Sequence, residues 1–293
     1  MRSNDMNQTL VNLFFILASA ACIFPFLLLF IASFSSEQSI LTKGYSLFPS
    51  EWSLEAYRYL WRNVDAIGRS YGITVLITAV GTTVGLFISA LLAYPLSRTD
   101  MPLKNTLSFI VFFTMLFNGG LVPTYLIYTE VFHIKNTLWA LIVPGLLTNG
   151  FFILLIRTFF RNSIPKEVIE SAYIDGAAEF KIFFRIVMPL SLPILATIGL
   201  MLGIAYWNDW FNGLIYITDS KLYSLQNLLN RMLQNIQFLQ QTNLGGRAEG
   251  ATSLPTNAVR MAMAVIGIVP ILLIYPFFQK FFVKGLTIGA VKG

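Results

Sequence analysis

Long apolar runs separated by short polar stretches form the main pattern along the chain. A helix needs about 20 predominantly apolar residues to cross the hydrocarbon layer of a bilayer, and six runs approach that length. The runs are continuously apolar rather than alternating, so the pattern predicts helices and not the strands of a barrel. The six predicted spans are Leu10–Ile31, Ile73–Leu96, Leu107–Tyr128, Leu138–Ile156, Leu190–Ile217 and Met261–Phe282. Prolines inside the runs, which membrane helices tolerate, predict kinks at Pro25, Pro123, Pro144 and Pro270.

Two amphipathic stretches lie outside the predicted spans. The sequence SLEAYRYLW at 53–61 fits a short interfacial helix. The sequence LYSLQNLLNRMLQNIQFL at 222–239 has leucine at helical spacing, and the polar, glycine-rich TNLGGRAEGATS follows it at 242–253. We expect a helix and then a loop exposed to a partner or a substrate, although a plain connector would show the same pattern.

The segment 162–189 is amphipathic and lies between the fourth and fifth predicted spans. Asn162 or Ser163 could cap a helix that has Pro165 in its first turn. Asp175–Gly176 then predicts the end of that helix, because glycine accepts the left-handed conformation common at a helix C-terminus. A second amphipathic piece follows from Phe180 to Val187. Patterning alone leaves two interpretations: this helix–turn–helix docks a partner, or it lies on the bilayer surface.

Composition supports a membrane class. Of the 293 residues, 56% are hydrophobic and 12% are charged, against about 25% charged in soluble domains. The low charge along the whole chain predicts an all-α, polytopic membrane protein with one transmembrane domain over residues 1–293. Lys and Arg are slightly more numerous on the side that holds 162–189, which places this segment and both termini in the cytoplasm. Residues 35–69 and 218–259 are then external.

The sequence lacks the residues that several kinds of chemistry need. Cys22 is the single cysteine, so an intramolecular disulfide is excluded, and His133 is the single histidine. The sequence has no phosphate-binding G-x-x-x-x-G-K-[ST] motif and no residues at metal-site or catalytic-triad spacing. We therefore expect a chain that is not an enzyme and binds no cofactor itself. The first apolar run continues to Phe30, too long for a signal-peptide core, which predicts an uncleaved first helix.

The loop sequence ESAYIDGAAEFKIFFRIVMPLSLP at 170–193 resembles the "EAA" loop of membrane subunits of bacterial ABC importers. Its form is similar to that of carbohydrate-importer permeases related to the second permease of the maltose system. Ser171 replaces the first alanine of the family pattern, a small departure. Further stretches also resemble this family: SYGITVLITAVGTTVGLFISALLAYPLSR at 70–98, WNDWF at 207–211 and FFVKGLTIGAVKG at 281–293. FNGGLVPTY at 117–125 looks like the branch for complex and acidic oligosaccharides, such as polygalacturonate and alginate fragments.

The resemblance implies a type I ABC importer permease fold with six transmembrane helices and a cytoplasmic coupling helix. The coupling helix would dock into a groove on an ATPase subunit, with Glu170 making polar contacts while Ala172 and Gly176 permit close packing. The implied partners are a second related permease, two ATPase subunits that bind ATP and Mg²⁺, a periplasmic or extracellular solute-binding protein and the lipid bilayer, with no nucleic acid. The expected coupling residues are Glu170, Ser171, Ala172, Asp175, Gly176 and Ala177.

Asp209 is an ionisable residue within the fifth apolar run, and such residues are functional candidates. It lies beside Trp207 and Asn208, and an aromatic ring with amide or carboxylate groups suits a sugar. The alternative is structural, because tryptophan collects at membrane interfaces in any case. In the third run, Asn118 precedes two glycines and predicts an unwound or closely packed point on the same substrate pathway.

These observations favour a permease subunit that forms half of the pathway for an oligosaccharide, with an acidic one as the narrower expectation. An ion-coupled secondary transporter is the alternative from another class, but it usually needs internal repeats and ionisable groups near the midplane. An ABC permease for another solute, such as an amino acid, phosphate or a peptide, is the third reading.

Overall fold

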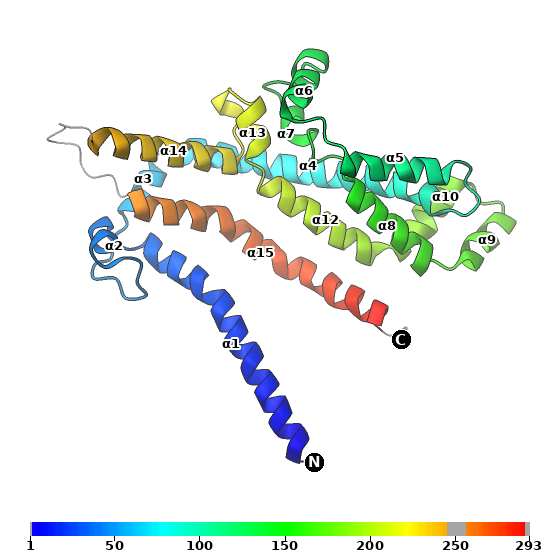
Figure 1. The fold of residues 1–293 in the computed structure, drawn as a ribbon, viewed down its shortest axis with the longest axis horizontal. Coiled ribbons are helices and arrows are strands. Elements are labelled where there is room, and N and C mark those ends of the chain that lie inside the picture. Colours follow the sequence, from blue (N-terminus) through cyan, green and yellow to red (C-terminus); the bar gives the residue numbers. More distant parts are fainter. Residues whose placement is uncertain (1, 245–255, 291–293) are drawn as a thin grey trace. The chain divides into compact units, whose positions relative to one another are not determined.

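The computed structural model describes residues 2–244 and 256–290, and these are almost entirely helical (Figure 1). Within the described residues no β-strand forms, and Ser35 pairs with Trp52 in an isolated bridge. The longer helices are α1 (Arg2–Ser33), α4 (Val64–Ser97), α5 (Lys104–Leu116), α8 (Gly150–Ser163), α12 (Leu192–Trp207), α14 (Leu225–Leu244) and α15 (Thr256–Ala290). The shorter ones are α2 (Glu37–Lys43), α3 (Glu55–Trp61), α6 (Leu121–Leu126), α7 (Trp139–Ile142), α9 (Lys166–Ile174), α10 (Glu179–Ile182), α11 (Met188–Leu190) and α13 (Phe211–Tyr216). The remaining turns are two π-helical ones, Ile127–Val131 and Phe183–Val187, and a 3₁₀ turn, Ser220–Leu222.

Among residues 2–244 and 256–290, three helical segments are long and apolar enough to cross a membrane: Gln8–Ser33, Val64–Ser97 and Thr256–Ile274. Two bent helix pairs raise the number to five if each pair is one span. These are Lys104–Leu116 with Leu121–Val131, bent by 112°, and Glu179–Leu190 with Leu192–Trp207, bent by 80°. The all-α class is therefore confirmed, and the first, second and sixth predicted spans form continuous helices. The prediction of six regular spans is not confirmed.

The third predicted span breaks after α5. The chain leaves the helix at Phe117, and Asn118 Oδ1 accepts a hydrogen bond from the Gly120 N–H at 2.9 Å. Gly120 has φ +86°, a conformation that favours glycine. The side-chain hydrogen bond and the positive φ together redirect the chain into α6, as the Asn-Gly-Gly sequence indicated.

The prediction of one continuous helix over the fourth apolar run, Leu138–Ile156, was wrong. Only α7 forms in its first part, and Pro144 and Gly145 follow in irregular backbone, with φ +72° at Gly145. Asn149 Oδ1 then caps α8 by accepting from the Phe151 N–H at 2.9 Å. The fifth predicted span also ends early, since α12 stops at Trp207 rather than continuing to Ile217.

The two amphipathic stretches outside the spans form helices as predicted. SLEAYRYLW contains α3, and the leucine-rich stretch lies in α14. α14 extends to Leu244, so the first residues of the expected loop at 242–253 are helical, and residues 245–253 lie outside the described residues.

The chain divides into two compact units. One contains α1 to α3, most of α14 and the first part of α15. Within this unit, the Glu37 carboxylate lies at the start of α15. It accepts hydrogen bonds from the backbone N–H groups of Asn257 and Ala258 at 2.9 and 3.1 Å, and from the Thr256 hydroxyl at 3.0 Å. A carboxylate is well placed there, because the first N–H groups of a helix lack partners within it.

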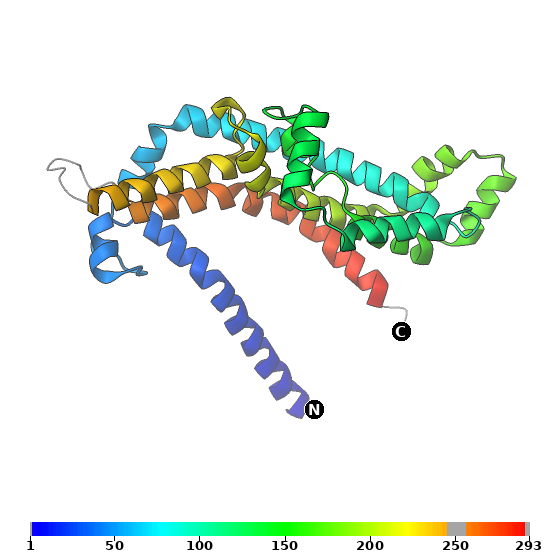
Figure 2. The same cartoon turned by 45° about the horizontal axis from the view of Figure 1, so that its top comes forward.

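The second unit contains most of α4 and all elements from α5 to α13. Here α4 runs alongside α12 (Figure 2). A methyl group on Gly81 of α4 would overlap the Tyr206 ring of α12, and one on Gly85 would lie 2.9 Å from the Leu147 carbonyl oxygen. Gly81 thus allows α12 to pack closely on α4, as small residues do in many membrane bundles, and Gly85 allows the irregular stretch before α8 to approach α4. The Tyr206 hydroxyl donates to the Ile142 carbonyl at 2.9 Å, which fixes the irregular stretch after α7.

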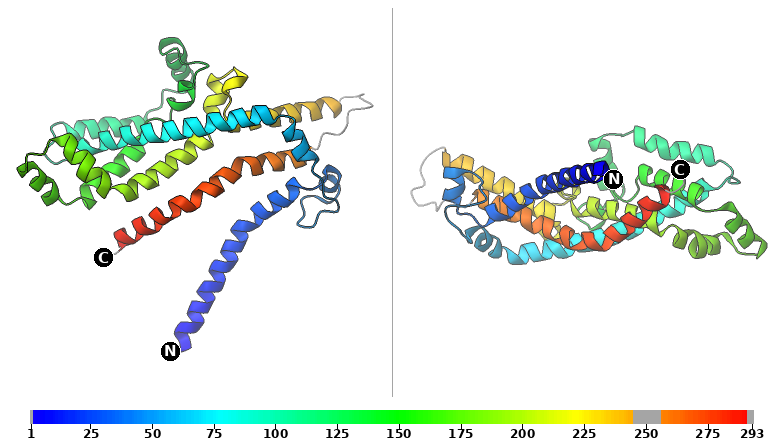
Figure 3. Two further views of the ribbon diagram at one scale, coloured as in Figure 1. Left: turned by 180° about the vertical axis from the view of Figure 1, so that it is seen from behind. Right: turned by 90° about the horizontal axis from the view of Figure 1, so that it is seen from below.

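A buried apolar cluster joins α4, α8 and α12 with the segment from α9 to α11. Its most buried members, each at most 1% exposed, are Ala90, Ala93, Leu96, Ile156, Ile182, Phe183, Val187 and Ile198. α9 lies at one end of the second unit, next to α8 and α10 (Figure 3). The segment from α9 to α11 packs on the rest of the second unit through this cluster.

Candidate coupling site

The loop begins where α8 ends. Ser163 is the last residue of α8, and the buried Ile164 is extended with φ −100° and ψ 116°. Pro165 occupies the N-cap position, and α9 starts at Lys166. The predicted cap at Asn162 or Ser163 was therefore wrong, as was the placement of Pro165 in the first turn. The physical reason is that a residue before proline avoids the helical conformation, so Ile164 separates the two helices.

The end of α9 is the turn that the sequence predicted. Gly176 has φ +74°, and its N–H donates to the Tyr173 carbonyl at 2.9 Å. The Ala177 N–H donates to the Ala172 carbonyl, also at 2.9 Å. These two hydrogen bonds and the left-handed glycine make a Schellman motif, which fixes the direction of the chain after the helix.

α9 has one face buried against its own chain and one face open. Ile169 and Ala172, each 8% exposed, belong to the apolar cluster. Glu170, Ser171 and Ile174 are exposed, and Ile174 is 87% exposed although it is apolar. Ala172, which was expected to permit close packing with an ATPase subunit, is buried, and its small side chain packs inside the protein. Of the other expected coupling residues, Asp175 and Gly176 are exposed and Ala177 is half-buried.

A polar network that the sequence reasoning missed ties α9 and α10 to the end of α4. Glu179, the first residue of α10, accepts a hydrogen bond from the Tyr94 hydroxyl at 2.6 Å and another from the Tyr173 hydroxyl. Arg98 Nη2 donates to the Tyr173 hydroxyl oxygen at 3.1 Å, and the Arg98 guanidinium lies 5.3 Å from the centre of the Tyr173 ring. Arg98 also forms an ion pair with Asp100 at 3.2 Å.

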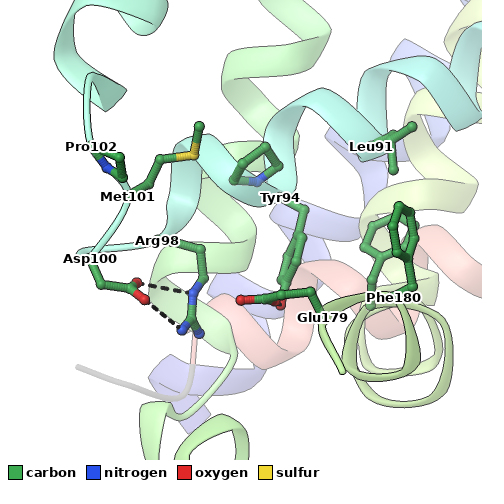
Figure 4. A pocket seen from close by; sticks show the side chains of 10 residues that line it. Leu91, Tyr94, Arg98, Asp100, Met101, Pro102, Glu179 and Phe180 are labelled. Atoms are coloured by element: carbon green, nitrogen blue, oxygen red, sulfur yellow. Dashed lines mark hydrogen bonds and ion pairs between the residues drawn. The ribbon is translucent and has the colours of Figure 1, made fainter. Parts of the chain in front are cut away.

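Four side chains of this network, Tyr94, Arg98, Asp100 and Glu179, line an open pocket of about 540 Å³. Figure 4 shows Tyr94, Arg98 and Glu179 turned toward the same space. Apolar side chains make most of the wall, and the full lining is Leu91, Tyr94, Pro95, Arg98, Asp100, Met101, Pro102, Glu179, Phe180 and Phe183. The pocket therefore has polar groups beside an apolar wall.

The electrostatics keep Tyr173 and Asp100 each in one protonation state near neutral pH. Burial and the hydrogen bond to Glu179 raise the pKa of Tyr173 to about 12, against the opposing effect of the Arg98 charge. Burial would raise the pKa of Asp100, but hydrogen bonds from its own backbone and from Arg98, with the charges of Arg98 and Lys104, lower it overall. Tyr173 is therefore a neutral donor and Asp100 a carboxylate.

The expected pathway residues lie elsewhere in the second unit. Trp207 is 5% exposed, Asn208 is exposed, and the Asp209 backbone carbonyl accepts from the Ser224 hydroxyl at 3.2 Å. Asp209 Oδ1 accepts from the N–H groups of Phe211 and Asn212 at 3.1 and 3.3 Å, so this oxygen anchors the start of α13. Asn118 is exposed at the α5–α6 break.

No group of three His, Cys, Asp or Glu side chains that could hold a metal ion occurs in the part of the chain that the structure describes.

Residues 4–288 match the family described as "Binding-protein-dependent transport system inner membrane component". The chain belongs to this family, and is accordingly a membrane permease subunit of a transport system. It is 38% identical, over 99% of both chains, to the polygalacturonan/rhamnogalacturonan transport system permease protein YtcP of Bacillus subtilis. It is 40% identical to the protein LplC of the same organism, over 94% of this chain and 90% of LplC.

The fold is similar to that of a solved chain from a bacterial ABC transporter involved in the import of the acidic polysaccharide alginate. The TM-score is 0.79 at 26% sequence identity, and the match covers 96% of this chain and 98% of the other. The resemblance to carbohydrate ABC importer permeases, first seen in the loop motif, is thus confirmed across nearly the whole chain.

Proposed function

We propose that this permease forms half of the translocation pathway of an ATP-driven ABC importer for an acidic oligosaccharide, delivered by a solute-binding protein. The similarity to YtcP and to the alginate transporter supports the substrate class. Basic residues in the stretches predicted to be external would suit an acidic sugar; Lys221, Arg231 and Arg260 lie in the described part, and Arg247 lies outside the described residues.

We propose α9 as the coupling helix. The observation that carries this proposal is that one face of α9 is buried against its own chain while the opposite face is exposed. Its inner face is packed on the core of the second unit, and its outer face presents Glu170, Ser171 and Ile174. Ile174 is apolar and 87% exposed in the chain alone, and a docked ATPase subunit would cover it. Asp175 and Gly176 continue that surface, with the half-buried Ala177 at its edge.

In the proposed cycle, α9 transmits movement of the ATPase subunits to the permease. ATP and Mg²⁺ bind to two cytoplasmic ATPase subunits, and closure of these subunits moves the docked helix as a rigid body. This permease and a second, related one then open toward the outside and receive the sugar, and ATP hydrolysis resets the pathway inward. In this scheme both termini are cytoplasmic, and Trp207, Asn208, Asp209 and Asn118 line the sugar's route.

The test is uptake into proteoliposomes that contain this permease, its partner permease and the ATPase, with the binding protein added outside. We expect uptake of galacturonate or alginate oligosaccharides that requires enclosed ATP, and much weaker uptake of neutral malto-oligosaccharides of equal length. Uptake that persists on a proton gradient without ATP would contradict an ABC importer. Preference for the neutral sugar would contradict only the acidic substrate.

A further inference from the structure

We propose that Glu179 is a positioning residue that locks the coupling helix α9 to α4, so that force applied to α9 reaches α4 directly. This inference rests on the proposed coupling role of α9. Glu179 makes no contact with a partner in this scheme, and it acts through the two tyrosines that donate to it.

The geometry places one carboxylate between three helices. Glu179 starts α10, Tyr94 belongs to α4, and Tyr173 lies in the last turn of α9. One carboxylate oxygen accepts from Tyr94 at 2.6 Å, and the other accepts from Tyr173. Both oxygens are thus used, and each connects a different helix to α10.

The packing of α9 explains why such a lock is needed. Of its nine residues, only Ile169 and Ala172 are buried. Ile164 and Pro165 connect it to α8 in extended backbone, and the turn at Gly176 connects it to α10. A short helix that has only two buried side chains and a non-helical residue at each end can change its tilt relative to the core. Movement of a docked ATPase would then be lost in the loop.

Hydrogen bonds to a charged group are stronger than those between neutral groups, which suits a carboxylate to this role. Arg98 adds a second connection from the end of α4, since it donates to the Tyr173 hydroxyl oxygen and lies over the ring. The raised pKa of Tyr173 keeps the proton on the donor at physiological pH. The lock therefore holds α9 at its C-terminal end, through Tyr173 in its last turn.

The experiment measures sugar imported per ATP hydrolysed, in proteoliposomes that contain the complete transporter. We expect Glu179→Ala to lower this ratio by roughly tenfold while ATP hydrolysis continues, a size typical of lost hydrogen bonds to a charged group. Glu179→Gln keeps one acceptor oxygen and should recover part of the ratio. Tyr173→Phe should lower the ratio alone but lower it much less in the Glu179→Ala background, because only the hydrogen bond from Arg98 is then left to lose.

Two matched controls should keep the wild-type ratio. Glu55→Gln changes an exposed carboxylate at the start of α3, and Tyr45→Phe removes the hydroxyl of an exposed tyrosine, and both residues lie outside the second unit. If Glu179→Ala does not assemble, Tyr173→Phe removes a single oxygen and carries the same expectation.

The outcomes separate this inference from the function on which it rests. A wild-type transporter without ATP-dependent uptake would overturn the proposed function. A working wild type with an unchanged ratio in Glu179→Ala and Tyr173→Phe would overturn only the lock. Equal loss of hydrolysis and import would also overturn it, and would assign Glu179 a structural role.

Discussion

At the scale of single residues, one carboxylate determines how the last long helix begins. Glu37 of α2 accepts hydrogen bonds from the Asn257 and Ala258 N–H groups and from the Asn257 side-chain amide at 2.7 Å. These residues are more than 200 positions apart, and the sequence gives no sign of the pairing. The interaction combines a charge with the positive end of a helix dipole.

Glu37→Ala should therefore lower the free energy of unfolding by about 1–2 kcal/mol, because it removes a half-buried charge-assisted cap. The measurement is thermal unfolding of the purified chain in detergent, followed by tryptophan fluorescence. Glu55→Ala is the control, since Glu55 is exposed at the start of α3. Equal melting temperatures for Glu37→Ala and the wild type would show that this cap adds nothing.

At the same scale, the sequence could predict some residues of the coupling site and not others. Gly176 was predictable, because a local Asp-Gly signal ends an amphipathic pattern. Tyr94 and Glu179 are 85 residues apart, and no local pattern connects two residues at that separation. Ala172 was expected to permit close packing with an ATPase subunit, and in the structure it is buried beside Ile169, where its small side chain packs within the chain.

At the scale of elements, periodicity located most helices but did not show where long apolar runs break. α4 contains Pro95 and α15 contains Pro270 and Pro276, and both helices continue through these prolines along their apolar runs. The run at 138–156 is as apolar, but Gly145 adopts positive φ and Asn149 starts a new helix with its side chain. Hydropathy averages over such local signals, so it predicted one span where the structure has two pieces.

The C-terminus of α9 offers a test that separates backbone strain from contact with a partner. A side chain at Gly176 must adopt left-handed φ at a cost of about 1–2 kcal/mol, for alanine and leucine alike. The space around this glycine is open within the chain, since an added Cβ meets nothing within 4 Å. The chain alone therefore has room for either side chain.

We expect Gly176→Leu to leave the protein inserted but to uncouple ATP hydrolysis from transport, and Gly176→Ala to do so much less. The reason is that the larger side chain would block the docked ATPase, while both variants carry the same strain. The measurements are membrane content of the permease and sugar imported per ATP. Normal transport with Gly176→Leu would count heavily against docking at this turn.

At the scale of the whole molecule, the proposed mechanism depends on which side of the membrane each exposed segment occupies. The distribution of Lys and Arg predicts that 162–189 lies inside and 35–69 outside. Each segment holds a highly exposed reporter position: Ile174 in α9 is 87% exposed, and Trp61 in α3 is 75% exposed. Cys22 is the single native cysteine, so a Cys22→Ser background allows one thiol to be introduced at a time.

In that background, a membrane-impermeant maleimide should label Trp61→Cys in cells with an intact inner membrane. It should label Ile174→Cys only after that membrane is permeabilised, because an ATPase inside the cell can act only on a loop that faces it. Trp61→Cys is also the control for access, since it must react before and after permeabilisation. Labelling of Ile174→Cys from outside would place α9 beyond the reach of cytoplasmic ATP, and a coupling helix at this position would then be impossible.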